Sequence, residues 1–172
     1  MNKTDMTIAI RRGVDADAEA FRELRLQALR NHPEAYSADY EVQALWPMES
    51  WLDRLRINPI YFAVDEEANG ALVGITGIFP GNTLKTRHRA TIWGVYVRPS
   101  HRGRGLAGQL VLACVDWAAQ AALRLVTLSV VTSNTPAVNC YKRCGFTISG
   151  VEPDGIYSNG IYYDEFTMIK WL

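Results

Sequence analysis

Residues 90–108 read ATIWGVYVRPSHRGRGLAG, and they set the architecture of the chain. The first eight residues are apolar or β-prone and predict a strand, and the stretch that follows is rich in turn residues. A helix to about residue 122 comes next, because apolar residues recur every three or four positions, at Leu106, Leu110, Cys114, Trp117 and Ala121. Residues 125–131 are almost wholly apolar, as buried parallel strands are. A strand, a helix and a strand in this order predict a parallel pair with a right-handed crossover.

The flanking sequence extends this unit into one domain. Further strands are predicted at 7–12, 61–65, 71–79, 146–149 and 162–170, and further helices at 16–30, 47–57 and 135–144. Asn69-Gly70 indicates a hairpin turn, Thr135 is expected to cap the last helix, and residues 34–46 and 151–160 are expected to be loops. The order predicts a single α/β domain of mixed α+β character over 1–172. Its central sheet is mixed and mostly antiparallel, with one parallel strand pair and about four flanking helices.

Composition limits the class of protein. The chain has 172 residues, 48% of them hydrophobic and 21% charged, which excludes a disordered tail, a collagen and a coiled coil. No apolar run approaches the ~20 residues that cross a bilayer, and Met1–Arg12 lacks the apolar core of a secretory signal. Three cysteines form an odd, sparse set, typical of the reducing cytoplasm rather than of a disulfide framework. Cys140 and Cys144 lie one helical turn apart, but they lack two further ligands for a metal site.

The net charge of zero conceals an uneven distribution of charge. Residues 68–151 contain nine Lys and Arg and a single acid, Asp116. This stretch is either a solvated basic face or a patch for an anionic ligand. An RNA-binding protein would more often be basic overall, so RNA binding is a minor alternative.

The turn Arg102–Gly108 is the sharpest chemical signal. Three glycines allow close approach of the backbone to a ligand, and a helix start offers unpaired N–H groups and partial positive charge to a phosphate. Leu106-Ala107 stands where a Walker loop has Lys-Ser/Thr, and no acid for a ribose occurs between Ala118 and Val151. Two interpretations of this turn remain: it binds a phosphate ligand other than these nucleotides, or its glycines serve only the geometry of the turn.

Arg102-x-x-Gly105-x-Ala107 resembles the Arg/Gln-x-x-Gly-x-Gly/Ala motif of the GNAT superfamily of N-acetyltransferases. The strand Trp93–Val97 lies before the motif as it does in that family, and the segment from Asn134 through Tyr141 to Gly145-Phe146 resembles the family's later Asn…Tyr-x-x-x-Gly-Phe segment. The resemblance covers nearly the whole chain. It implies the GNAT fold, in which two central parallel strands splay apart.

The resemblance also implies acetyl-CoA as cosubstrate, no metal, and transfer of the acetyl group directly to a primary amine. The backbone N–H of Val95 is the expected oxyanion donor, and the Tyr141 hydroxyl is the expected proton donor to the leaving thiolate. The residues implied to bind the cofactor are Val95, Tyr96, Val97, Arg102, Gly103, Arg104, Gly105, Leu106, Ala107, Gly108, Asn134 and Tyr141.

The sequence leaves the general base and the acceptor open. The strand before the motif carries no carboxylate, and Glu41, His88, Asp164 and Glu165 are candidates for the base by chemistry alone. Residues 34–51 combine acids with aromatic residues, which suits a cationic amine of a small molecule, although these aromatics are equally suited to packing. A protein or peptide acetyltransferase and a non-catalytic acyl-CoA-binding module are the alternatives. The resemblance makes a homodimer through the late strands plausible, and neither nucleic acid nor membrane is an expected partner.

Overall fold

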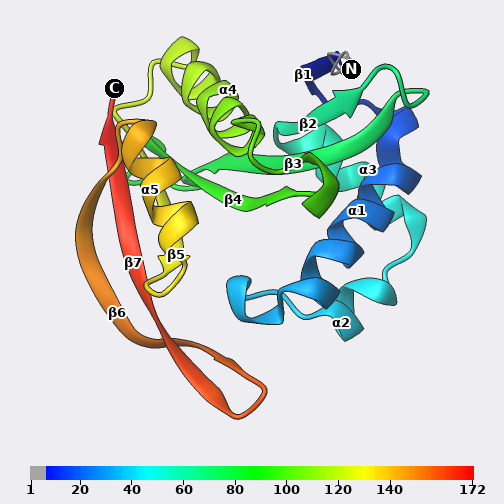
Figure 1. The fold of residues 1–172 in the computed structure, drawn as a ribbon. Coiled ribbons are helices and arrows are strands. Elements are labelled where there is room, and N and C mark those ends of the chain that lie inside the picture. The colour runs from blue at the N-terminus through cyan, green and yellow to red at the C-terminus, as the bar shows by residue number, and fades with distance from the viewer. Residues whose placement is uncertain (1–6) are drawn as a thin grey trace, which may run out of the picture.

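The computed structural model describes residues 7–172 and contains one seven-stranded sheet with helices on it (Figure 1). The strands are β1 Ile8–Arg12, β2 Ile60–Asp65, β3 Ala71–Pro80, β4 Arg89–Val97, β5 Leu125–Val131, β6 Thr147–Ser158 and β7 Ile161–Trp171. The helices are α1 Ala18–Asn31, α2 Tyr40–Ala44, α3 Met48–Ile57, α4 Leu106–Gln120 and α5 Thr135–Arg143, with 3-10 turns at Asp15–Asp17, Pro33–Ala35 and Pro99–His101. The lack of a secretory signal expected for Met1–Arg12 falls in part on residues 1–6, which lie outside the described residues.

The strand order is β1-β2-β3-β4-β5-β7-β6, and only the β4–β5 pair is parallel. This confirms the predicted mixed, mostly antiparallel sheet with one parallel pair. The pairing of β4 with β5 extends over three positions only, from Arg89 opposite Leu125 to Thr91 opposite Thr127. Beyond Thr91 the two strands have no register with each other, so a gap opens inside the sheet.

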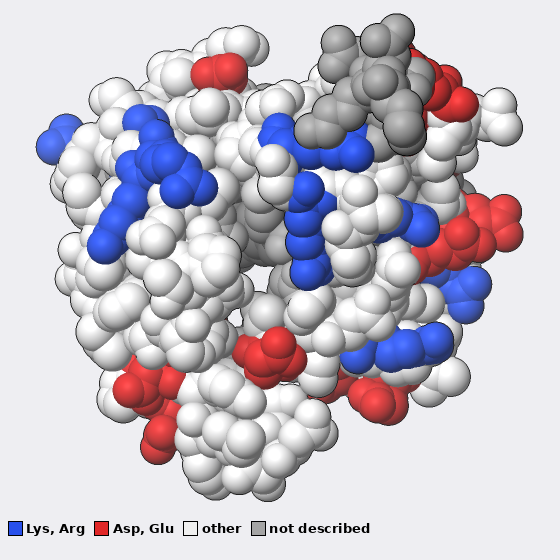
Figure 2. Space-filling view, viewed as in Figure 1, with Lys and Arg blue, Asp and Glu red and all other residues white. Residues whose placement is uncertain are grey.

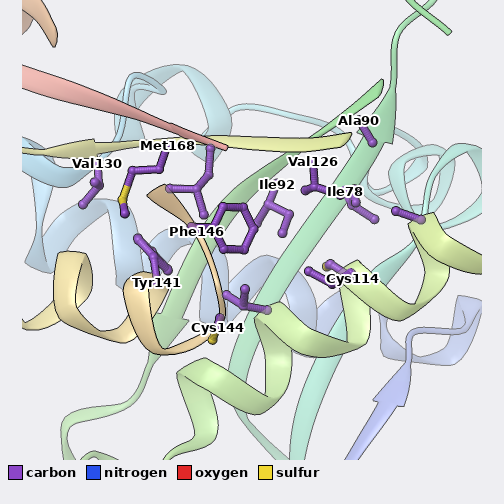
Figure 3. Packing of buried hydrophobic residues seen from close by; sticks show 14 of the residues in the cluster. Ile78, Ala90, Ile92, Cys114, Val126, Val130, Tyr141, Cys144, Phe146 and Met168 are labelled. Atoms are coloured by element: carbon purple, nitrogen blue, oxygen red, sulfur yellow. The ribbon is translucent and has the colours of Figure 1, made fainter. Parts of the chain in front are cut away.

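Helices cover the sheet on both sides and divide the core into clusters. One cluster joins α4 and α5 to β3, β4, β5 and β7, with Phe146 and Met168 at its centre (Figure 3). Another joins α1 and α3 to β2 and β3 around Phe21, Trp51 and Phe62, whose side chains are fully buried. Because each helix buries an apolar stripe, α4 and α5 are fixed on one face of the sheet and α1 and α3 on the other. No helix within residues 7–172 has the length and apolar character needed to cross a membrane.

The C-terminal hairpin differs from the prediction. The expected strands at 146–149 and 162–170 are parts of a longer hairpin, and most of the expected loop at 151–160 belongs to β6 (Figure 1). The turn consists of Asn159 and Gly160, both with positive φ. Pro153 suggests a loop, but β6 is the outermost strand, where a residue without an N–H is tolerated. The register shifts between Glu152 and Ile156, next to this proline.

Two predictions about helices are wrong in detail. The structure has five α-helices among the described residues rather than about four, because Tyr40–Ala44 forms the short helix α2 inside the expected loop. Asn134, not Thr135, caps α5: its Oδ1 accepts a 3.3 Å hydrogen bond from the Ala137 N–H. Asparagine is the stronger N-cap residue, and it leaves Thr135 inside the first turn.

Candidate active site

A cleft of about 770 Å³ lies where β4 and β5 part. Four segments line it: the end of α1 with the turn after it, the second half of β4 with the glycine turn, the end of β5, and α5. Its walls include His32, Glu34, Tyr36, Trp93, Gly94, Val95, Tyr96, Val97, Arg102, Gly103, Gly105, Leu106, Ala107, Gly108, Val130, Asn134, Cys140 and Tyr141. The cleft therefore gathers residues that are separated by more than a hundred positions in the sequence.

The glycine turn forms a cradle of free backbone donors at the start of α4. Gly103 and Gly105 have φ values of +76° and +74°, which glycine adopts without strain, and open space surrounds the position of a Cβ at each. Within the described residues, none of the N–H groups of 103–108 donates to a backbone or side-chain acceptor. Helix N-termini with unsatisfied N–H groups bind phosphates. The cradle thus suits a pyrophosphate.

Arg102 fixes the position of this turn against β4 and α1. Its Nε donates to the Val97 carbonyl at 2.9 Å, and its Nη2 donates to His32 Nε2 at 3.0 Å. The guanidinium also lies 5.7 Å from the Tyr96 ring centroid. Arg102 is therefore held in place by three partners, while its charge stays at the mouth of the cleft.

A bulge in β4 leaves Val95 without a strand partner. Gly94 has a φ of +68°, and the β3–β4 register passes from Trp93 opposite Gly77 to Tyr96 opposite Ile75. On its other side, β4 has already parted from β5. The Val95 carbonyl accepts a 3.0 Å hydrogen bond from the Tyr36 hydroxyl. The backbone at Val95 is thus displaced from the regular sheet and presented to the cleft.

Tyr141 lies on the α5 wall of the cleft, packed against Phe146 with ring centroids 6.5 Å apart (Figure 3). Only 7% of its surface is exposed. Burial raises the pKa of Tyr141 well above its ordinary value, and the nearby Tyr36, Cys140 and Cys144 raise it further. The hydroxyl therefore keeps its proton at neutral pH and is suited to donate it.

Most of the residues implied by the resemblance meet in this cleft. Arg104 is exposed and does not line it, and the Asn134 side-chain oxygen is engaged as the α5 cap. The four candidate bases, Glu41, His88, Asp164 and Glu165, also lie outside the cleft wall. Their roles, like those of the cofactor residues, remain predictions.

Sequence reasoning did not assign His32 to the site, and it included Glu34 only among the acids of the acceptor segment 34–51. His32 Nδ1 lies 3.5 Å from a Glu34 carboxylate oxygen, and both residues line the cleft beside Arg102. In the sequence, His32-Pro33 indicates only the end of a helix, and nothing near it in the chain indicates that His32 lies in a cleft. No group of three or more His, Cys, Asp or Glu within residues 7–172 is arranged to hold a metal ion.

Charge is distributed unevenly around the hollow in the middle of the view in Figure 2. Lys and Arg side chains lie above it, and Asp and Glu side chains lie around its lower rim. The arrangement suits an anionic ligand at one end and an amine at the other.

Comparisons with known proteins identify the fold and the family. A mycothiol acetyltransferase from Arthrobacter sp. (strain FB24) is 30% identical over 135 residues, which are 76% of this chain and 39% of that protein. The chain thus matches about two fifths of that relative's length. A GNAT-family acetyltransferase structure from Streptococcus pneumoniae is 25% identical, has a TM-score of 0.84, and aligns over 96% of this chain and 100% of that one.

A second solved structure was determined with a ligand. It is a putative acetyltransferase from Salmonella typhimurium with its cofactor acetyl-CoA, 21% identical, with a TM-score of 0.77 over 96% of this chain and 94% of that one. At this identity the likeness supports the fold alone. Residues 20–146 match the family described as "Acetyltransferase (GNAT) family". Together with the splayed strands and the glycine cradle, this match shows that the chain belongs to the GNAT acetyltransferase family.

Proposed function

We propose that the protein is an acetyl-CoA-dependent N-acetyltransferase that transfers the acetyl group directly to a primary amine of a small molecule. The observation that carries the proposal is the single cleft in which a phosphate cradle, a displaced strand and a buried tyrosine meet. Family membership and the mycothiol acetyltransferase among the relatives support it.

The cleft residues fit acetyl-CoA. The free N–H groups of 103–108 are suited to hold the pyrophosphate, with Arg102 adding charge beside them. The backbone of 95–97 has an unpaired edge toward β5 and is suited to an extended pantetheine arm, as an added strand would be. The carbonyls of Val95 and Val97 already accept from Tyr36 and Arg102, so these two carbonyls have one lone pair each left for the arm.

We assign each catalytic role to a group that lines the cleft. Bound acetyl-CoA would supply the thioester whose carbonyl carbon an amine attacks. In this proposal the Val95 N–H donates to the carbonyl oxygen as negative charge develops there. The Tyr141 hydroxyl, which keeps its proton at neutral pH, donates it to the departing sulfur.

The acceptor amine must lose a proton, and His32 and Glu34 lie side by side in the cleft wall. His32 Nε2 already accepts from Arg102 and its Nδ1 faces Glu34, so the Glu34 carboxylate is the member of this pair with lone pairs left for a proton. We therefore assign Glu34 as the candidate base, in place of the four residues suggested by chemistry alone.

Thermal unfolding with acetyl-CoA, NAD and ATP at equal concentrations tests cofactor binding. A ligand at a hundred times its Kd adds about 2.7 kcal/mol of stability, so acetyl-CoA alone should raise the Tm. Thiol release from acetyl-CoA with a panel of small amines then tests turnover. No shift at saturating acetyl-CoA would overturn the proposal. A shift without thiol release, or acetylated proteins in a labelled lysate, would favour the binding-module and protein-substrate alternatives respectively.

Two glycines offer a matched pair of variants. Gly105 has a φ of +74° in the cradle, and Gly160 has a φ of +81° in the distant β6–β7 turn, with open space at both Cβ positions. Alanine imposes similar backbone strain on each, about 1 kcal/mol. Gly105→Ala should also weaken acetyl-CoA binding, whereas Gly160→Ala should not. Equal effects of both variants on binding would place the pyrophosphate elsewhere.

The proposed assembly is a homodimer, and the proposed compartment is the cytoplasm. The outer strand β6 and its partner β7 expose Ile148, Val151, Tyr157, Ile161, Tyr162 and Trp171, an apolar surface suited to a second copy. All three cysteines are free, which suits a reducing compartment. Sedimentation velocity measures the assembly, and a monomer at micromolar concentration would contradict the dimer.

A further inference from the structure

Two arginines on the α1–α3 side of the sheet, the buried Arg25 and the half-buried Arg54, have no acidic partner among the described residues. Arg25 on α1 is 4% exposed, and its Nε and Nη1 are buried without a hydrogen-bond acceptor. Arg54 on α3 likewise has a buried Nη1 without an acceptor. Neither takes part in a salt bridge within residues 7–172. Buried charges are normally paired, so this concentration of positive charge needs a partner.

Aromatic rings hold both guanidinium groups in place. Arg25 lies 5.0 Å from the Tyr36 ring centroid and 5.3 Å from that of Trp93. Arg54 lies 4.8 Å from Trp93 and 4.9 Å from Trp46. Stacking of this kind orients a guanidinium and offsets part of its desolvation. It uses the face of the guanidinium, however, and leaves the N–H donors in the guanidinium plane without acceptors.

The Arg25 guanidinium lies directly behind the cleft wall. The Tyr36 and Trp93 rings flank the guanidinium, and both residues line the cleft. Gly94, the residue after Trp93, lines the cleft as well. A Cβ built on Gly94 would lie 3.1 Å from Arg25 Nη1. Glycine at this position therefore leaves the guanidinium separated from the cleft by a bare backbone, one residue from the Val95 N–H.

The two ends of the acceptor region carry opposite charge. Glu34 lines the cleft two residues before Tyr36, and Arg25 lies on the far side of that tyrosine ring. Burial lowers the pKa of Arg25 to about 10, so it remains charged at neutral pH. A ligand with an ammonium group and an oxyanion a few bonds apart would match both charges.

We infer that the acceptor is an amine that also carries a carboxylate or similar compact oxyanion, and that the positive charge of Arg25 and Arg54 behind the cleft wall attracts this group. Arg25 does not itself line the cleft, so its charge acts across the bare backbone at Gly94, where the low dielectric of the protein strengthens the attraction. The inference rests on the proposed acetyltransferase function and names its substrate class. It makes Arg25 and Arg54 specificity residues for the acceptor, with no role in binding acetyl-CoA.

Matched acceptor pairs test the inference. Thiol release from acetyl-CoA is measured for a panel of free amino acids and for the amides of the same amino acids, in which only the carboxylate is removed. The expected kcat/KM is at least tenfold higher for the acids, because the amide carries no negative charge to be attracted by the two arginines. Amides that react as well as their acids would overturn the inference without touching the proposed function.

Arginine variants locate the effect. Arg25→Gln should lower kcat/KM for the acid by about tenfold to a hundredfold, through KM, and leave the rate with the amide and the KM for acetyl-CoA unchanged. Arg25→Lys keeps a positive charge at this position, so it should stay closer to wild type than Arg25→Gln does. Arg56→Gln is the control, because Arg56 is an exposed arginine on the same α3 helix as Arg54 that pairs with Asp15 and Glu49.

The outcomes separate the two proposals. If acetyl-CoA does not stabilise the protein, the proposed function fails. If it does, and Arg25→Gln reduces rates with acids and amides equally, the proposed function stands and the carboxylate site is wrong. Should Arg25→Gln not fold, as shown by its thermal unfolding, the wild-type comparison of acids with amides decides alone.

Discussion

The Tyr36 hydroxyl donates a 3.0 Å hydrogen bond to the Val95 carbonyl, which joins the segment after α1 to the bulge of β4. Tyr36→Phe removes this donor and leaves a half-buried carbonyl unsatisfied. We expect the free energy of unfolding to fall by about 1 kcal/mol. We also expect the KM for acetyl-CoA to rise, because the bulge that presents Val95 becomes looser. Urea denaturation and steady-state kinetics measure the two effects.

The control for this variant is Tyr157→Phe, which changes an exposed tyrosine of the β6–β7 hairpin. It should alter neither quantity. An unchanged KM in Tyr36→Phe would mean that the hydrogen bond does not position Val95.

Tyr141→Phe removes the proposed proton donor while keeping the ring that packs on Phe146. Because only the hydroxyl changes, acetyl-CoA binding and Tm should stay close to those of wild type. The kcat should fall by about 10²–10⁴, the usual contribution of a general acid. Stopped assays of thiol release and thermal shift with acetyl-CoA measure both. A kcat equal to that of wild type would assign Tyr141 to packing.

Cys140 should react with iodoacetamide near neutral pH. The neighbouring Cys144 thiol lowers the pKa of Cys140 to about 7, whereas the same contact and burial raise that of Cys144. The thiolate is the reactive form, so the alkylation rate should rise through pH 7 and level off about one unit higher. Because Cys140 lines the cleft, acetyl-CoA should slow its alkylation.

Mass spectrometry of the alkylated protein locates the reacted cysteine, and Cys140→Ser serves as its control. Cys114 is buried and should stay unmodified in the folded protein. A midpoint near pH 9, or no protection by acetyl-CoA, would contradict the interpretation of this side chain.

Asp17 should contribute stability that acid removes. It accepts two hydrogen bonds from Arg11, at 2.7 and 2.8 Å, and one from the Val14 N–H, which together hold its pKa below the ordinary value. A carboxyl with a lowered folded-state pKa stabilises the protein above its unfolded-state pKa, near 3.9, and loses this contribution as pH falls through the folded-state value. Arg11 is partly exposed, so Asp17→Asn should cost about 1 kcal/mol at pH 7.

The difference in unfolding free energy between Asp17→Asn and wild type should shrink below pH 4, as measured by urea denaturation at a series of pH values. Asp15→Asn, which affects the exposed Asp15–Arg56 pair, is the comparison and should have a smaller effect at every pH. A difference that stays constant with pH would attribute the loss to the altered turn rather than to the charge.

The sequence predicted those parts of the site whose structure depends on residues adjacent in the chain. The Gly103–Gly108 turn, the helix behind it and the apolar strand 125–131 are each specified by their own sequence, so their positions agree with the structure. The part of β6 after residue 149 was missed because Pro153 disfavours a strand in isolation, and only its place at the sheet edge makes it acceptable.

Residues whose environment comes from distant segments could not be predicted. In the sequence Arg25 looks like an ordinary polar position of α1, and it is buried only because Tyr36 and Trp93 close over it. His32 follows the same rule, since its place in the cleft depends on a contact with Arg102, seventy residues later. Tertiary packing, rather than propensity, makes these residues a site.

The parting of β4 and β5 after three residue pairs gives the sheet an uncovered edge in its middle. Most proteins keep such edges at their periphery and protect them with charge or proline, because open backbone groups recruit stray strands. In the proposed function, the pantetheine arm of acetyl-CoA covers this edge. We therefore expect the purified protein to be more open to proteases and to self-association without the coenzyme than with it.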